Sequence, residues 1–430
     1  MNLNSIKFRH IINLRNIYIL SVINCLSLII ICGRQWYSDT RSYVLAWNNI
    51  SSFHIDMWRP PVYPVFLGIL KSIFGNSHFL FYGTIVQHIV FLISIYYFYK
   101  LATIIINSNN ISLIITVFYA LYPCVPTWNC FMITEPFAIY GIIFMLYSAF
   151  MAYHKESALH IAAFTFWMLF LIFLRPAQMY ILPVFLVGWI ILFVKKRKLS
   201  KTIIGGILGV AFSIGAITYY SYAFKNNYGI FTPSGIGVIN RYYISRLDGV
   251  IYPEYTNNQG LKQYIEKTIK VHGQKYSGGT DHDLYMETEE AIYTYGLREV
   301  SDLVDKSERT DMQTYVRRFF QRLHRAANDK MFSTLIHKWK NVTDIIGVNI
   351  KIIYWLLIIY PMLLTYWMIR WRQIAWQSII LYMLGFSHLF LIIYACQNVW
   401  DRLIIPAVPI YIIMIGQLFK QITADKISYT

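Results

Sequence analysis

The chain alternates long apolar runs with short polar breaks, and most of the runs are long enough to cross a membrane. A helix needs about 20 apolar residues to span the hydrocarbon core of a bilayer. Runs near this length occur at 17–33, 79–99, 104–123, 131–153, 158–174, 178–194, 202–224, 346–369, 374–396 and 402–419. The pattern predicts an all-α polytopic membrane protein with about ten transmembrane helices.

One shorter run, 61–74, needs a different interpretation. It begins with prolines and contains Lys71, and it is too short for a span, so we expect an interfacial or re-entrant helix. The distribution of basic residues supports this, because cytoplasmic loops carry an excess of Lys and Arg. Counting 61–74 as a span would place the cluster from Lys195 to Lys201 outside the cell. Without it, both termini are predicted to be cytoplasmic, in a multi-pass protein of the plasma (inner) membrane.

This topology divides the chain into three parts. Residues 1–224 form an N-terminal membrane domain with a first extracytoplasmic loop at 34–78, and residues 346–430 form the C-terminal transmembrane helices. Residues 225–345 form an extracytoplasmic insert that holds fifteen of the 21 acidic residues. Helical patterns near 286–308 and 311–327 predict that the insert is mainly helical.

Composition narrows the possible partners. Hydrophobic residues make up 57% of the chain and charged residues only 14%, against roughly 25% in a soluble domain. The net charge of +17 is typical of basic residues beside membrane spans, and no nucleic-acid motif accompanies it, so we expect no nucleic acid partner. The five cysteines lack metal-ligand spacing. We expect no cofactor; a divalent metal is possible but not indicated.

The few acidic residues outside the insert lie mostly on one side of the membrane. Four of the six are predicted to be extracytoplasmic: Asp39, Asp56, Glu135 and Asp401. Three arginines belong to the same layer: Arg59, Arg175 and Arg402. Ionisable groups at a membrane boundary cost several kcal/mol unless they are paired or line a wet cavity, so this layer predicts a site.

Each of these residues also has a structural interpretation. Asp39 opens a helix and is suited to an N-cap or to a general base, and a carboxylate can do both. Arg59-Pro60-Pro61-Val62-Tyr63-Pro64 forms either a rigid turn or the wall of a site. Glu135 suits the positive end of a helix dipole, Arg175 an interfacial anchor, and Arg402 a pair with Asp401. In the insert, Arg241 and Arg246 follow turn-forming residues, where a loop can drape over a membrane-level cavity.

The order of these motifs resembles the GT-C membrane glycosyltransferases, a superfamily that includes the protein O-mannosyltransferases and the aminoarabinose transferases of lipid A. The first-loop match consists of Asp39, Tyr43 and Ala46, then Arg59-Pro60-Pro61-Val62-Tyr63-Pro64-Val65-Phe66-Leu67 and Phe74-Gly75. Later matches are Thr134-Glu135-Pro136, Arg175-Pro176 and Arg402-Leu403-Ile404-Ile405-Pro406-Ala407-Val408-Pro409. The similarity covers the membrane domain and not the insert.

The resemblance implies a polyprenyl-phosphate-linked sugar donor and an extracytoplasmic acceptor hydroxyl on a glycan, lipid or protein. It makes Asp39 the catalytic base, Arg175 and Arg402 contacts of the donor phosphate, and Glu135 a wall of the acceptor side. Many relatives carry a second acid beside that aspartate, where this chain has Thr40. Together with the motifs above, Tyr43, Arg59, Tyr63 and Arg241 are further candidate substrate-binding residues.

Two alternatives remain from the sequence. An O-antigen-type polysaccharide polymerase or ligase also combines many spans with one large outer loop, and we expect such an enzyme to work with arginines. A lipid or sugar flippase is the non-enzymatic alternative. Transporters usually show internal repeats and ionisable sites near the bilayer midplane, and the sequence shows neither.

Overall fold

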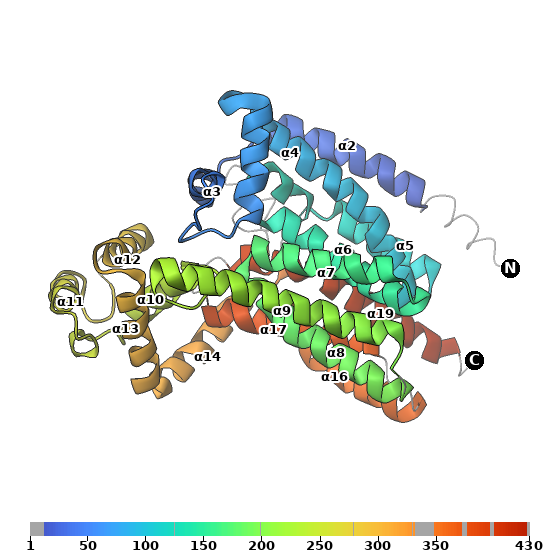
Figure 1. Ribbon diagram of the computed structural model, residues 1–430. Helices are drawn as coiled ribbons and strands as arrows, with labels where there is room; N and C mark the ends of the chain where they lie inside the picture. Colours follow the sequence, from blue (N-terminus) through green and yellow to red (C-terminus); the bar gives the residue numbers. More distant parts are fainter. Residues whose placement is uncertain are drawn as a thin grey trace.

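The computed structural model is built almost entirely of α-helices (Figure 1). It describes residues 13–123, 125–197, 199–277, 279–328, 330–331, 348–371, 376–395 and 400–427. Its membrane-type helices are α2 (Leu14–Cys32), α4 (Val62–Ile106), α5 (Asn109–Leu121), α6 (Glu135–Lys155), α7 (Ala158–Leu174), α8 (Ile181–Lys196), α9 (Lys201–Tyr228), α16 (Lys351–Trp371), α17 (Trp376–Ala395) and α19 (Val408–Ile427). The polar helices are α3 (Ser38–Ser51), α10 (Ile236–Asp248), α11 (Gln259–His272), α12 (Asp281–Tyr295), α13 (Leu297–Thr310), α14 (Met312–Asn328) and α18 (Trp400–Leu403).

Short 3-10 turns and one small strand pair complete the described chain. The turns are η1 (Pro126–Cys130), η2 (Pro176–Tyr180), η3 (Pro253–Tyr255) and η5 (Ile405–Ala407), and β1 (Lys330–Met331) pairs antiparallel with β2 (Val348–Asn349). Within the described residues, nine helical stretches are long and apolar enough to cross a membrane, and α7 is a shorter apolar helix. The prediction of an all-α, multi-pass membrane protein is thus confirmed, while the exact number of spans and their orientation stay predictions.

The element α4 consists of two helical segments. The sequence predicts separate helices at 61–74 and 79–99, and the stretch Val62–Ile106 is accordingly interrupted at Gly75, where φ is +71° and the backbone is not helical. Glycine adopts positive φ without steric cost, so the chain turns sharply there. Figure 1 shows the first segment at a steep angle to the second. The following break lies at Asn107, which takes a left-handed conformation, so the helix α5 begins later than the predicted 104.

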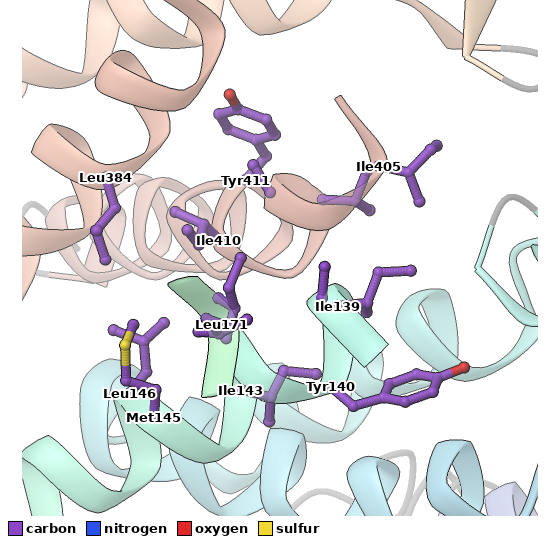
Figure 2. Close-up of a cluster of buried hydrophobic side chains, with 14 of the residues drawn as sticks. Ile139, Tyr140, Ile143, Met145, Leu146, Leu171, Leu384, Ile405, Ile410 and Tyr411 are labelled. Carbon is purple, nitrogen blue, oxygen red and sulfur yellow. The ribbon is translucent and has the colours of Figure 1, made fainter. Parts of the chain in front are cut away.

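The buried core of the bundle includes side chains from α6 and α19, the two helices near whose starts Glu135 and Arg402 lie. Figure 2 shows side chains of α6 and α7, such as Ile143 and Leu171, close to side chains of α17 and α19, such as Leu384 and Ile410. All four of these side chains are at most 1% exposed. Because α6 begins with Glu135 and α19 follows Arg402, packing in this core fixes where both charged residues lie.

The insert has a second hydrophobic core. Its buried members come from the end of α9 and from α10 to α13, and include Ile239, Tyr242, Leu261, Ile292 and Val300. Figure 1 shows these insert helices gathered at one end of the bundle. The last part of the predicted insert, residues 332–345, lies outside the described residues.

Close packing of α3 against α4 depends on Gly68. A Cβ atom added there would lie 2.1 Å from the ring of Trp47 on α3. We expect Gly68→Ala to destabilise the protein by about 1–3 kcal/mol, because the Trp47 ring must leave its packed position. Gly215→Ala on α9 is the matched control, since nothing lies within 4 Å of its added Cβ. The check is thermal unfolding followed by tryptophan fluorescence in detergent; equal midpoints for the two variants would contradict the prediction.

Candidate functional site

Five predicted residues form a chain of alternating charges at one end of the bundle. Asp39 pairs with Arg59 at 2.9 Å and with Arg402 at 2.6 Å. Arg402 also donates from Nε to Glu135, and Glu135 pairs with Arg175 at 3.2 Å. The order is therefore Arg59, Asp39, Arg402, Glu135, Arg175, with a net charge of +1. Such pairing is what permits these groups to be buried at a membrane boundary.

Asp39 lies in the first turn of α3 and does not cap it. The backbone N–H of Tyr37 instead donates to Thr40 Oγ1 at 3.1 Å, and the Thr40 hydroxyl donates to the carbonyl of Met132. This fastens the start of α3 to the segment before α6. Both carboxylate oxygens of Asp39 are left for the two arginines, one oxygen each. Thr40, which stands where relatives in the resembled superfamily carry a second acid, has a structural role here.

A tight turn held by Asp56 positions Arg59. One Asp56 oxygen accepts from the backbone N–H groups of Trp58 and Arg59 at 2.9 and 2.7 Å, and the other accepts from the Asn49 amide at 2.9 Å. The Arg59 guanidinium then bonds the hydroxyls of Ser42 and Tyr43 besides Asp39. Asp56 is thus a positioning residue for the first arginine of the charge chain.

The second end of the charge chain is held by the helices of the membrane bundle. The Arg402 guanidinium lies 4.5 Å from the ring centre of Tyr37, and Arg402 comes from the short helix α18 just before α19. The Glu135 side chain is fully buried at the start of α6, and Arg175 follows the end of α7. The predicted Asp401–Arg402 pair is not described, because the side chain of Asp401 lies outside the described residues.

A cleft of about 970 Å³ opens beside this charge chain, between the first loop and the insert. One wall consists of residues from α3 and the 56–59 turn, including Asp39, Ser42, Asn49 and Arg59, and Arg402 lies at its edge. The opposite wall comes from α10 and α12 and includes Asn240, Tyr243, His282, Tyr285, Glu289 and Tyr293. The cleft therefore has both a charged wall and a wall rich in aromatic side chains.

Hydrogen bonds tie the two walls together. The Ser234 hydroxyl donates to the carbonyl of Trp58 at 2.6 Å, and Gly235 N–H donates to the carbonyl of Met57 at 2.8 Å. The Trp58 indole donates to the Tyr293 hydroxyl at 2.7 Å. The turn that carries Arg59 is consequently held from the insert side as well as by Asp56.

Five predicted substrate-binding residues do not line the cleft: Glu135 and Arg175, which lie behind Arg402 in the charge chain, and Tyr43, Tyr63 and Arg241. Tyr43 and Tyr63 are buried and pack edge to face, with ring centres 4.9 Å apart, so they support the site from beneath. Arg241 pairs with Asp305 and Glu308 inside the insert. The helical turn explains this, since Asn240 and Tyr243 on α10 face the cleft and residue 241 points about 100° away from residue 240.

Sequence reasoning missed several residues that build the cleft. Asp56 appears in the predicted layer without a role, and the aromatic residues Trp58, Tyr285 and Tyr293 were not singled out. A helical pattern in the insert predicts that α12 exists but gives no sign of which loop it faces. The periodicity of α12 alone therefore could not have found these residues.

The two arginines determine the protonation state of Asp39. Burial alone would raise the pKa of its carboxyl group, but the charges of Arg402 and Arg59 outweigh burial and hold the pKa well below the ordinary 3.8. The carboxylate is therefore ionised over the whole physiological pH range. In this resting arrangement it is a weak proton acceptor.

This pKa predicts how stability depends on pH. A carboxylate whose pKa is lowered on folding contributes stability that is complete above its unfolded pKa and is lost as the pH falls toward its folded pKa. We expect the difference in unfolding midpoint between the wild type and Asp39→Asn to stay constant from about pH 8 to pH 5 and to shrink below about pH 4. Thermal unfolding of both proteins across this range is the measurement. A difference that already shrinks between pH 7 and pH 5 would contradict the low pKa.

Among the described residues, no group of three or more His, Cys, Asp or Glu side chains is placed to hold a metal ion. The charge chain is built from arginines and carboxylates instead. Its arginines are suited to bind an anion, since a guanidinium offers several donors to phosphate or carboxylate oxygens.

Comparison with known proteins assigns the chain to no family. No family model matches the chain, and no curated protein matches it. The resemblance to GT-C enzymes thus stays an expectation from the sequence motifs alone.

Proposed function

We propose that this protein is an integral-membrane glycosyltransferase that moves a sugar from a polyprenyl-phosphate-linked donor to an extracytoplasmic acceptor hydroxyl. The observation that carries the proposal is the position of Asp39 at the wall of a large cleft, with two arginines on its carboxylate. A carboxylate and arginines in one cleft are the groups that a hydroxyl acceptor and a phosphate leaving group require.

The arginines of the charge chain have different tasks in this proposal. Arg59 and Arg402 line the cleft and are available to a donor phosphate. Arg175 is absent from the cleft lining and lies behind Glu135. Its task is then to orient Glu135, which in turn holds Arg402. This refines the expectation that Arg175 touches the phosphate directly and that Glu135 forms the acceptor wall.

The chemical step follows from competition for Arg402. When the donor phosphate attracts Arg402, Asp39 loses part of its counter-charge and becomes a stronger base. The acceptor hydroxyl gives its proton to Asp39, its oxygen forms the new bond to the sugar's anomeric carbon, and the bond from that carbon to the phosphate oxygen breaks. The polyprenyl phosphate leaves with the electron pair and is stabilised by the arginines.

The shape of the cleft supports a carbohydrate acceptor. Its volume of about 970 Å³ lies in the range of small-molecule sites, roughly 300–1,000 Å³. Tyr243, Tyr285 and Tyr293 offer flat apolar faces beside polar groups such as Asn240 and Glu289. The insert covers the reacting groups and limits the access of water, which reduces hydrolysis of the donor.

Mass spectrometry of cells with and without the gene tests this function. We expect loss of the gene to remove one sugar from a cell-surface glycan, lipid or protein, and to cause that sugar to accumulate on a polyprenyl phosphate. Unchanged surface glycans together with unchanged lipid-linked sugars would overturn the proposal.

One observation favours a second candidate, the polysaccharide polymerase or ligase that works with arginines. Arg59 and Arg402 both face the cleft, and the low pKa of Asp39 weakens it as a base. In that enzyme Asp39 would only hold the arginines in place. Substitution of Asp39 separates the two functions, as argued in the Discussion.

A further inference from the structure

A second, smaller pocket lies on the insert and shares no lining residue with the cleft. It has a volume of about 100 Å³, close to the space of three water molecules at ~30 Å³ each. Its walls come from the end of α10, the segment after α11, and α14: Leu247, Asp248, Lys275, Tyr276, Arg318, Gln321, Arg322 and Arg325. We call it the α14 pocket. It has room for one small polar group and not for a sugar chain.

The charge of the α14 pocket is strongly positive. Four of its lining residues are basic, namely Lys275, Arg318, Arg322 and Arg325, and Asp248 is the one acid among them. The positive charges of Arg322, Arg318 and Lys275 all lie close enough to the Asp248 carboxyl group to stabilise its ionised form. Lining charge of this kind favours an anion.

Arg322 gives the second, independent sign of a ligand. Its side chain is 2% exposed, and its Nη1 atom donates to Asp248 at 2.8 Å. Its Nε and Nη2 atoms are buried without a hydrogen-bond partner among the described residues, and so is Nε of Arg318. Leaving buried donors of a charged group unbonded costs free energy, so this pattern indicates a missing acceptor.

Helix α14 also has the features of a helix at a membrane surface. Phe319 packs against Phe390 near the end of the membrane helix α17, with ring centres 5.2 Å apart. Three apolar side chains at i, i+4 spacing, Met312, Val316 and Phe320, are exposed by 53%, 46% and 60%. At 100° per residue this stripe lies on the face of α14 opposite Arg318 and Arg322, so the contact between Phe319 and Phe390 is what places the pocket near the membrane helices.

We propose that the α14 pocket binds a phosphate group, with Arg318, Arg322 and Lys275 as its donors. The position of α14 beside the membrane helices makes the headgroup of an anionic phospholipid the expected carrier. A free phosphate ion is the other source of the same chemistry. This site is separate from the cleft and does not depend on the proposed transferase activity.

Two binding experiments on the purified full chain distinguish the sources. In the first, inorganic phosphate is titrated against the detergent-solubilised protein at constant ionic strength, and the unfolding midpoint is followed. In the second, the protein is placed in nanodiscs of phosphatidylcholine with or without phosphatidylglycerol, and retained lipid is counted by native mass spectrometry. Binding of phosphatidylglycerol alone assigns the pocket to lipid headgroups, whereas stabilisation by inorganic phosphate alone assigns it to the free ion.

Arg318→Gln and Arg317→Gln form a matched pair on the same helix, because Arg317 does not line the pocket. Removing one charge-assisted hydrogen bond should weaken binding about tenfold or more for Arg318→Gln and leave Arg317→Gln unchanged. If Arg318→Gln fails to fold, the exposed Lys275→Gln takes its place. The proposal is overturned if neither probe binds the wild type, or if both variants bind as well as the wild type.

Discussion

Replacing Asp39 by Asn is expected to lower the rate of sugar transfer by about 10²–10⁴, the contribution typical of a general base, while the protein stays folded. Asparagine keeps the size of the side chain but cannot accept the proton of the acceptor hydroxyl. The arginines retain other partners, since Arg402 still pairs with Glu135 and Arg59 still bonds Tyr43. The measurement is the rate at which isolated membranes consume their polyprenyl-linked sugar.

Asp302→Asn is the control for this substitution. Asp302 makes an exposed ion pair with Arg298 on α13, away from the cleft, so it carries the same change of charge without touching the site. We expect its transfer rate to match the wild type. If Asp39→Asn also transfers sugar at nearly the wild-type rate, the base mechanism fails and the arginine-dependent polymerase or ligase is favoured.

Much of the membrane architecture can be predicted from the sequence because it depends on local composition. Apolar runs of sufficient length must be helices in lipid, since no water is present to bond an open backbone. The pattern of apolar runs also predicts which charged residues of the site lie on the same side of the membrane. Asp39, Glu135 and Arg402 each lie where a helix begins or ends, and helices that cross repeatedly bring alternate ends to one side.

The pairing within that layer could not be predicted, because it depends on which helices become neighbours. Arg402 is 363 residues from Asp39 and 267 from Glu135 in the sequence, yet it bonds both. The sequence offers its neighbour Asp401 as one alternative partner. Similarly, the contact between α12 and the first loop arises from tertiary packing, which no local pattern encodes.

Replacing Arg402 by Gln is expected to destabilise the protein by about 3 kcal/mol, at the lower end of the cost of breaking a buried ion pair. Arg402 is the central member of the charge chain, and its side chain is only 11% exposed. Without it, the ion-pair partner left among the described residues is Arg175 for the fully buried Glu135, and Arg59 for Asp39. Thermal unfolding followed by tryptophan fluorescence should show a midpoint several degrees lower than that of the wild type.

A double substitution separates loss of this charge from loss of packing. The double variant Glu135→Gln/Arg402→Gln removes the buried negative charge together with its partner. We expect its loss of unfolding free energy to be about 1–2 kcal/mol smaller than the sum of the losses in the two single variants. Arg298→Gln, which breaks an exposed pair, should change stability by less than about 0.5 kcal/mol. If Arg402→Gln unfolds no earlier than Arg298→Gln, Arg402 does not link the two acids in solution, and the charge chain cannot be what positions Asp39 at the cleft.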